Sequence, residues 1–167
     1  MNNKLSIEEF RKYKEQLQKI IDDFKNNYEV MKNNPSYNEA QEEEKSIAAY
    51  FKIEQDLFSY DLSAIPYEEY QNLSMIATDQ EELDLSNSHA NIDFSLVEVY
   101  GHCNFKGCNL KNIEKVNDRI SPKYLDTDIF LKNKDLFLSS NFPEWFQEKW
   151  YYGDLSIEDV TKLDKTL

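Results

Sequence analysis

The sequence contains little of what marks secreted, membrane-spanning or nucleotide-binding proteins. Among its 167 residues are only 2 cysteines and 3 glycines, too few for a disulfide framework, and the glycines form no phosphate-binding loop. No run of about 18 apolar residues is present, so the sequence offers no candidate membrane span. The first residues carry charges where a signal peptide needs an apolar stretch. We therefore expect a soluble protein of the reducing cytoplasm.

Basic side chains are missing from the middle of the chain. Residues 53–105 contain no Lys or Arg but 11 Asp and Glu, which is most of the formal net charge of −13. Such a surface attracts cationic partners and disfavours direct contact with nucleic acid or anionic membranes, because phosphate contacts need Lys and Arg. The same composition is typical of a solvated acidic face that only aids solubility, and this alternative stays open.

The apolar content indicates a folded protein. Apolar residues make up 40% of the chain and aromatic residues 14%, which is enough to form a core without disulfides or a metal. A chain of this length is most simply one domain, with the possibility of a separable helical arm.

The N-terminal part predicts two helices in a hairpin. Ser6 and Glu9 have the spacing of a capping box, in which each side chain binds the other residue's backbone amide. Apolar residues then recur at steps of three and four, which predicts a helix from about residue 7 to 32. Ser36 and Glu39 repeat the capping-box spacing, and a second helix is expected to continue to about Tyr60. Because the connection is short, the helices should pack antiparallel.

The spacing of apolar residues in the first helix has a second interpretation. It resembles a heptad pattern, so the N-terminal helix could instead form the seam of a homodimeric coiled coil. The pattern lasts barely two heptads, and a partner helix follows directly in the sequence, which favours the intramolecular hairpin. Further along, Pro66 suits the first turn of a short helix extending to about Leu73, followed by a polar connection over residues 77–82.

A five-residue layout recurs between residues 83 and 114. It consists of a small residue, Asn, a large apolar residue and two mostly polar residues. Two copies stand in tandem at 103–107 (CNFKG) and 108–112 (CNLKN), an earlier copy lies at 90–94 (ANIDF), and a weaker one at 83–87 (LDLSN). This stretch resembles the pentapeptide-repeat family, whose motif is roughly A(D/N)LXX.

The resemblance implies a right-handed, four-sided β-helix in which each unit forms one side. The large apolar residues Ile92, Phe105 and Leu110 would fill its core, the small residues Ala90, Cys103 and Cys108 would lie beneath the corners, and the intervening Asn and Asp would face outward. With so few units, we expect a short, irregular stack of strands capped by helices. Some members of the family are acidic mimics of duplex DNA that occupy the DNA site of a topoisomerase. For this shorter chain, the resemblance implies at most an acidic patch that occludes a basic groove.

The sequence contains no arrangement that indicates an enzyme, a metal or a cofactor. Cys103 and Cys108 share their neighbourhood with His89 and His102, but the repeat phase places both thiols inside the core, where cysteine acts as a small apolar residue. Asp126 and Asp128 lie two residues apart, which is more typical of helix capping than of a carboxylate pair. We therefore expect no catalytic, metal-binding or cofactor-binding residues.

The C-terminal part predicts short helices that cap the stack. Phe142, Trp145, Phe146 and Trp150 fall at helical spacing and form an aromatic face, for which we expect either a cap over the strands or an interface. Gly153 suits the end of that helix, and a final short helix is expected to follow.

These observations together predict an α+β protein. It would comprise a helical hairpin over residues 1–62, an acidic segment with a short, irregular right-handed β-solenoid-like centre over 63–120, and a helical aromatic cap over 121–167. We expect a non-enzymatic bacterial or phage protein-binding module, such as an inhibitor that covers the basic, nucleic-acid-binding surface of a partner protein. The alternative is a structural or targeting domain of a larger bacterial effector or toxin. The predicted partner-binding residues are acidic or aromatic: Glu68, Glu69, Asp79, Glu81, Glu82, Asp84, Trp145, Phe146 and Trp150.

Overall fold

The computed structural model describes residues 3–77, 81–101 and 103–111, together with the single residues 144, 145, 156, 158, 159 and 162. The elements in chain order are the α-helices α1 (Ile7–Met31) and α2 (Glu39–Leu57), the 3-10 helix η1 (Tyr67–Tyr70), and the strands β1 (Leu73–Ile76), β2 (Leu83–Asp84), β3 (Asn91–Asp93), β4 (Val97–Tyr100), β5 (Cys103–Asn104) and β6 (Asn109–Lys111). The predicted α+β class is confirmed.

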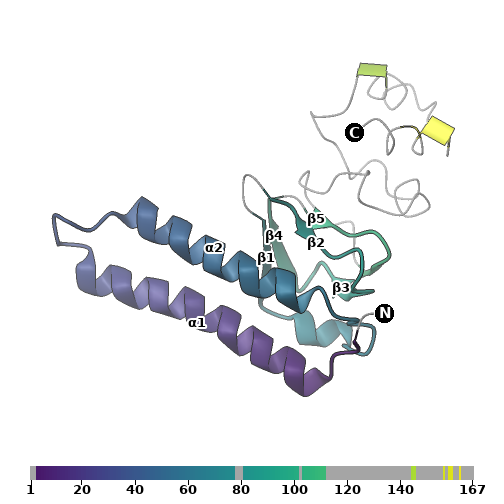
Figure 1. The fold of residues 1–167 in the computed structure, drawn as a ribbon, viewed down its shortest axis with the longest axis horizontal. Coiled ribbons are helices and arrows are strands. Elements are labelled where there is room, and N and C mark those ends of the chain that lie inside the picture. Colours follow the sequence, from purple (N-terminus) through teal and green to yellow (C-terminus); the bar gives the residue numbers. More distant parts are fainter. Residues whose placement is uncertain are drawn as a thin grey trace.

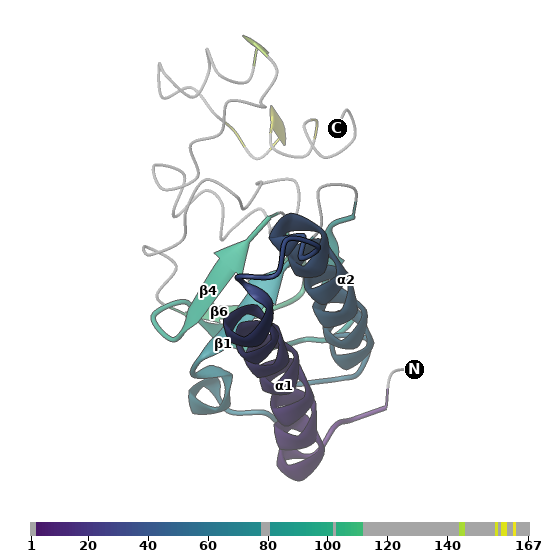
Figure 2. The same cartoon turned by 90° about the vertical axis from the view of Figure 1, so that its left-hand side faces the viewer.

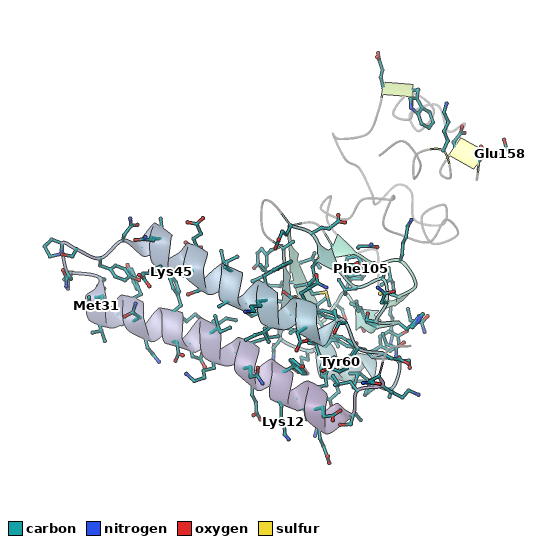
Figure 3. The ribbon with its side chains drawn as sticks, viewed as in Figure 1. Lys12, Met31, Lys45, Tyr60, Phe105 and Glu158 are labelled. Atoms are coloured by element: carbon teal, nitrogen blue, oxygen red, sulfur yellow. The ribbon has the colours of Figure 1, made fainter. Side chains whose placement is uncertain are left out.

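The helices α1 and α2 form the predicted antiparallel hairpin (Figures 1 and 2). The capping box at the start of α1 is present, because the Ser6 hydroxyl accepts from the Glu9 amide at 3.2 Å and the Glu9 carboxylate accepts from the Ser6 amide at 2.9 Å. One end of the hairpin lies against the strands. The other end, marked by Met31 and Lys45 in Figure 3, extends past them.

The predicted bounds of the second helix are wrong at both ends. Its N-cap is Asn38, whose side-chain oxygen accepts from the Gln41 amide at 3.1 Å, whereas the Ser36 amide donates to the side chain of Asn34. Asn is as good an N-cap as Ser, so the residue nearer the helix takes the position. The helix ends at Leu57, three residues before the predicted end, because the amides of Ser59 and Tyr60 bind carbonyls three residues earlier instead of four.

The helix predicted from Pro66 to Leu73 is also wrong. Only the four residues of η1 form a helical turn, with Pro66 as an extended N-cap. Asn72 then adopts a φ of +65°, which reverses the chain, and Leu73 begins strand β1. Pairing between β1 and β4 therefore determines the conformation here, and it overrides the local helical signal.

The strands form three parallel two-stranded sheets. Strand β1 pairs with β4, β2 with β5, and β3 with β6. Each of the first three strands therefore pairs with the strand three places further along the chain. The chain makes a first pass through β1, β2 and β3, and then a second pass through β4, β5 and β6 beside the first.

The same corner precedes the third strand of each pass. Asn91 of β3 pairs with Asn109 of β6, so His89 and Gly107 hold equivalent positions two residues before them. Both have positive φ values, +49° and +77°. A Cβ added to Gly107 would lie 3.3 Å from the carbonyl oxygen of Ser86, so this corner is close to the first pass.

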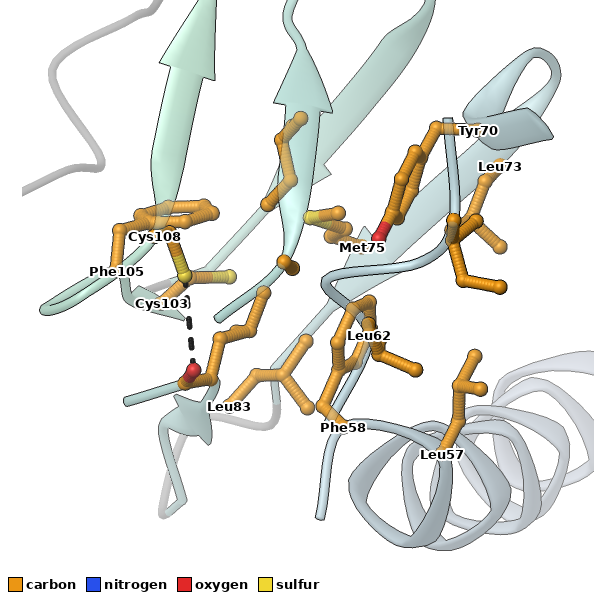
Figure 4. Packing of buried hydrophobic residues seen from close by; sticks show 14 of the residues in the cluster. Leu57, Phe58, Leu62, Tyr70, Leu73, Met75, Leu83, Cys103, Phe105 and Cys108 are labelled. Carbon is orange, nitrogen blue, oxygen red and sulfur yellow. Dashed lines mark hydrogen bonds between the residues drawn. The ribbon is translucent and has the colours of Figure 1, made fainter. Parts of the chain in front are cut away.

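The side chains that the repeat pattern directs inward form part of the core. Ala90, Ile92, Cys103, Phe105 and Cys108 are all buried, which confirms the expected direction of these side chains (Figure 4). Leu110, also expected to fill the core, is only partly buried. It belongs to β6, and within the described residues no later strand follows to cover it.

One core joins the hairpin to the strands. Phe10 of α1, Leu57 of α2 and Met75 of β1 are each fully buried in the same apolar cluster. Tyr70 of η1 packs its ring edge to face against Phe10, with the ring centroids 5.1 Å apart. The hairpin predicted over residues 1–62 and the first pass of strands therefore share one core.

Candidate functional site

Some carboxylates of the acidic segment serve the fold. The Asp84 carboxylate accepts from the amide of Ser86 at 2.9 Å and from its hydroxyl at 2.6 Å, and Asp93 makes the same two bonds with Ser95. These are Asx turns, in which an Asp side chain closes a turn two residues further on. Asp84, a predicted partner-binding residue, therefore has a structural role at the end of β2.

The Asx turns repeat a sequence pattern that our sequence analysis missed. An Asp, a buried apolar residue and a Ser occur at 61–63, 84–86 and 93–95, and in each case the Ser amide donates to the Asp side chain at 2.9 Å. Asn104 and Lys106 follow a similar arrangement, with the Lys106 amide donating at 3.1 Å. The spacing alone could have identified these carboxylates as turn formers.

Glu69, another predicted partner-binding residue, holds α1 against η1. Its carboxylate accepts from Nε and Nη2 of Arg11 at 3.0 and 2.6 Å, and Lys14 donates to the Glu69 and Gln71 carbonyls. The hydrogen bonds from Arg11 lower the pKa of Glu69. Glu69 therefore remains charged within an ion pair that spans 58 residues of sequence.

The remaining predicted acidic residues differ in their surroundings. Glu68 is exposed on η1, Glu81 and Glu82 are exposed just before β2, and Asp79 lies outside the described residues. Glu98 on β4, which the sequence analysis did not select, is also exposed, and its carboxylate accepts from the Tyr100 hydroxyl at 2.6 Å. Of the predicted acidic residues, Glu81 and Glu82 are therefore the two that are adjacent in sequence and both exposed.

Glu81 lines an open groove of about 440 Å³ along α2. The other lining residues are Ala48, Phe51, Lys52, Gln55, Asp56 and Ser59. The residues from Ala48 to Asp56 recur at steps of three and four, so they form a single stripe of α2, and Ser59 follows the end of the helix. Ala48 and Phe51 contribute apolar surface to the groove, and the Asp56 carboxylate accepts from the Tyr13 hydroxyl at 2.6 Å. The groove combines apolar surface with the carboxylates of Asp56 and Glu81 and the ammonium of Lys52.

Polar side chains of α2 also bind backbone groups of the first pass. The Tyr50 hydroxyl donates to the Ser74 carbonyl at 2.7 Å. The amide of Gln55 donates to the Asp84 carbonyl at 3.0 Å, and its oxygen accepts from the Asp84 amide at 3.1 Å. These side chains occupy hydrogen-bonding positions that a neighbouring strand would otherwise take.

Glu54 completes this set from a fully buried position. Both of its carboxyl oxygens accept from the Ile76 amide, at 3.1 and 3.0 Å, and the residue has 0% exposure. Burial raises its pKa well above the ordinary value, since the charged form loses its hydration. Glu54 lies between the buried residues Tyr50 and Leu57 on one face of α2, and this spacing could have predicted its burial.

The predicted aromatic interface is described at only one residue. Trp145 is partly buried, and the Lys162 ammonium lies 4.5 Å from the centre of its ring, which is a cation–π contact. Phe146 and Trp150 lie outside the described residues, as do Asp126 and Asp128.

The two thiols lie in the core rather than in a site. Cys103 and Cys108 are free and buried, and the Cys108 thiol donates to the Leu85 carbonyl at 3.6 Å (Figure 4). Burial raises the pKa of Cys103, and the carboxyls of Glu54 and Glu82 raise it further, so the thiolate is disfavoured. His102 lies outside the described residues, among which no three His, Cys, Asp or Glu side chains gather in a metal-binding arrangement.

In the part of the chain that the structure describes, no helix has the length and apolar character to cross a membrane. Comparison of the chain with family models, curated proteins and solved structures found no match.

Proposed function

We propose that this protein is a non-enzymatic acidic binding module that covers a basic surface of a partner protein and thereby inhibits it. The observation that supports this function best is the pair of exposed carboxylates, Glu81 and Glu82, beside the groove along α2. They belong to a segment, residues 53–105, that contains no Lys or Arg. A partner with a cationic surface would be attracted to this region over a distance and oriented by it.

The groove suggests the shape of the bound part. Its apolar surface at Ala48 and Phe51 favours an apolar side chain. The two carboxylates at Asp56 and Glu81 outnumber the one ammonium at Lys52, so they favour nearby Lys or Arg side chains. A segment that combines an apolar side chain with Lys or Arg is typical of the surfaces with which nucleic-acid-handling proteins contact phosphates. Such a protein is the partner class that we propose, and its basic groove would be blocked when the module binds.

The strand passes would provide a rigid support for this surface. We propose that they are two turns of a short right-handed β-solenoid, as the repeat pattern implies. The parallel pairing of successive passes supports this architecture. So does the contact between Asn109 and Asn91, in which one side-chain amide donates to the other side-chain oxygen at 3.1 Å. Like residues stacked on adjacent turns are a common feature of solenoids.

The test begins with the untagged full chain, which is used to capture a partner from a bacterial lysate for identification by mass spectrometry. Binding of that purified partner is then measured by surface plasmon resonance at two salt concentrations. Double reversal of Glu81 and Glu82 to Lys should slow association strongly at low salt and less at high salt. The fold should be unaffected, since both residues are exposed.

The matched control is reversal of Glu43 and Glu44 to Lys, two exposed carboxylates of α2 outside the basic-free segment. These changes alter net charge equally, so they separate a local contact from general attraction. If the Glu81 and Glu82 reversals bind like the unchanged protein, the acidic face is only a solvated surface. If Trp145→Ala instead speeds dissociation with little dependence on salt, the aromatic residue makes the contact.

A further inference from the structure

Glu54 occupies an unusual place between the hairpin and the strands. It projects from α2, is fully buried, and both carboxyl oxygens accept from the Ile76 amide of β1. Among the described residues, no Lys, Arg or His forms an ion pair with it. A buried carboxylate without a cation has a high free energy, whereas the neutral acid does not.

The titratable groups near Glu54 do not compensate its charge. Tyr50, one turn earlier on α2, directs its hydroxyl to the Ser74 carbonyl. The Glu54 carboxyl raises the pKa of the Cys103 thiol of β5, so these two groups interact electrostatically. Glu82, before β2, also raises the pKa of Cys103, so it adds a negative charge to this region. Strand β1 itself contains no titratable side chain. Among the described residues, these ionisable neighbours are either neutral when protonated or negative, so none of them stabilises an ionised Glu54.

We propose that Glu54 makes the attachment of α2 to β1 dependent on pH. When neutral, its carboxyl remains buried against the Ile76 amide and the helix stays on the edge of the strand. When ionised, the buried carboxylate has only the Ile76 amide to stabilise its charge, which offsets less than the hydration lost on burial, so this part of the contact opens to water. The inference concerns the junction of hairpin and strands, and it does not depend on the proposed binding function.

The direction of the effect follows from proton linkage. The attached state keeps the proton, because burial raises the pKa of Glu54, while the opened state releases it near the ordinary value of 4.5. Attachment is therefore strongest below pH 4.5 and weakens as the pH rises towards the raised pKa. Within that range, linkage of one proton changes the opening equilibrium by up to about tenfold per pH unit.

Hydrogen exchange of the Ile76 amide in the full chain tests this inference. Protection factors are measured by NMR from pH 5 to pH 8 and corrected for the intrinsic pH dependence of exchange. In the unchanged protein, protection of this amide should fall by up to about tenfold per pH unit. In Glu54→Gln, whose amide oxygen can accept the same bond without ionising, the fall should be absent. Glu44→Gln, an exposed change on the same helix, should retain the fall.

A Glu54→Gln protein with the same pH dependence as the unchanged protein would overturn the proposal. If that variant does not fold, the carbon-13 shift of the Glu54 carboxyl in the unchanged protein decides the question. A midpoint near the ordinary 4.5 overturns the proposal, and a midpoint well above it supports the proposal.

Discussion

The aromatic rings of Phe94 and Phe105 meet edge to face, with their centroids 5.4 Å apart and their planes inclined at 72°. Phe94 directly follows β3 of the first pass, and Phe105 directly follows β5 of the second. Both are buried, with 6% and 1% exposure. The pair therefore joins the two passes inside the core, where an aromatic pair adds to the free energy gained from burial alone.

Phe105→Ala should lower the free energy of unfolding by about 3–5 kcal/mol, because it removes a buried ring and leaves a cavity. Denaturant unfolding followed by circular dichroism measures the change. Val30→Ala is the control, since Val30 is 80% exposed and a surface substitution usually changes stability by about 0.5 kcal/mol or less. A loss below about 1 kcal/mol in Phe105→Ala would contradict the central position of this ring.

The two asparagines that contact each other across the passes should differ in importance. The Asn91 side chain donates to the carbonyls of Ser63 and Ile65 and accepts from Asn109. Asn91→Ala leaves several groups without partners and should lower the free energy of unfolding by about 1–3 kcal/mol, whereas Asn109→Ala should lower it by about 1 kcal/mol or less. The same unfolding experiment compares them, and an equal effect would contradict this order.

Substitutions of Gly107 test the corner before β6. Gly107→Ala should lower stability by about 1–2 kcal/mol, because its φ of +77° is strained for an alanine. Gly107→Asn should lower it less, since Asn adopts this conformation more readily than other non-glycine residues. If both variants lose the same amount, the close approach to Ser86 matters more than the backbone angle.

The thiols of Cys103 and Cys108 should react slowly with Ellman's reagent in the native protein. Both are buried, and burial raises the pKa of Cys103, so neither access nor thiolate formation favours reaction. Both should react at once in denaturant. Free cysteine under the same conditions provides the reference rate, and one thiol reacting at that rate in the native protein would contradict their burial.

Local patterns predicted much of this fold. The Ser6 capping box, the spacing of apolar residues in the first helix and the inward direction of Ile92 and Phe105 all depend on residues close in sequence. The strand at Leu73 was missed because its partner, Val97, lies 24 residues further on. No local pattern identifies such a pair, and the proline at 66 suggested a longer helix instead.

In the candidate site, too, features that depend on nearby residues could be predicted, and those that depend on distant residues could not. The exposure of Glu81 and Glu82 agrees with the polar sequence around them. The pairing of Glu69 with Arg11 could not be predicted, because it joins residues 58 apart. Glu54 could have been predicted in part: it falls on the buried stripe of α2, where an acidic residue signals an unusual environment.

The polar side chains of α2 also bear on solubility. An uncovered strand edge offers a row of free amides and carbonyls to any other chain, and it is a common starting point for aggregation. In this protein Tyr50, Glu54 and Gln55 bind the edge of the first pass at Ser74, Ile76 and Asp84. Loss of all three would leave this edge open to self-association, so this part of α2 protects the molecule from aggregation through its own sheets.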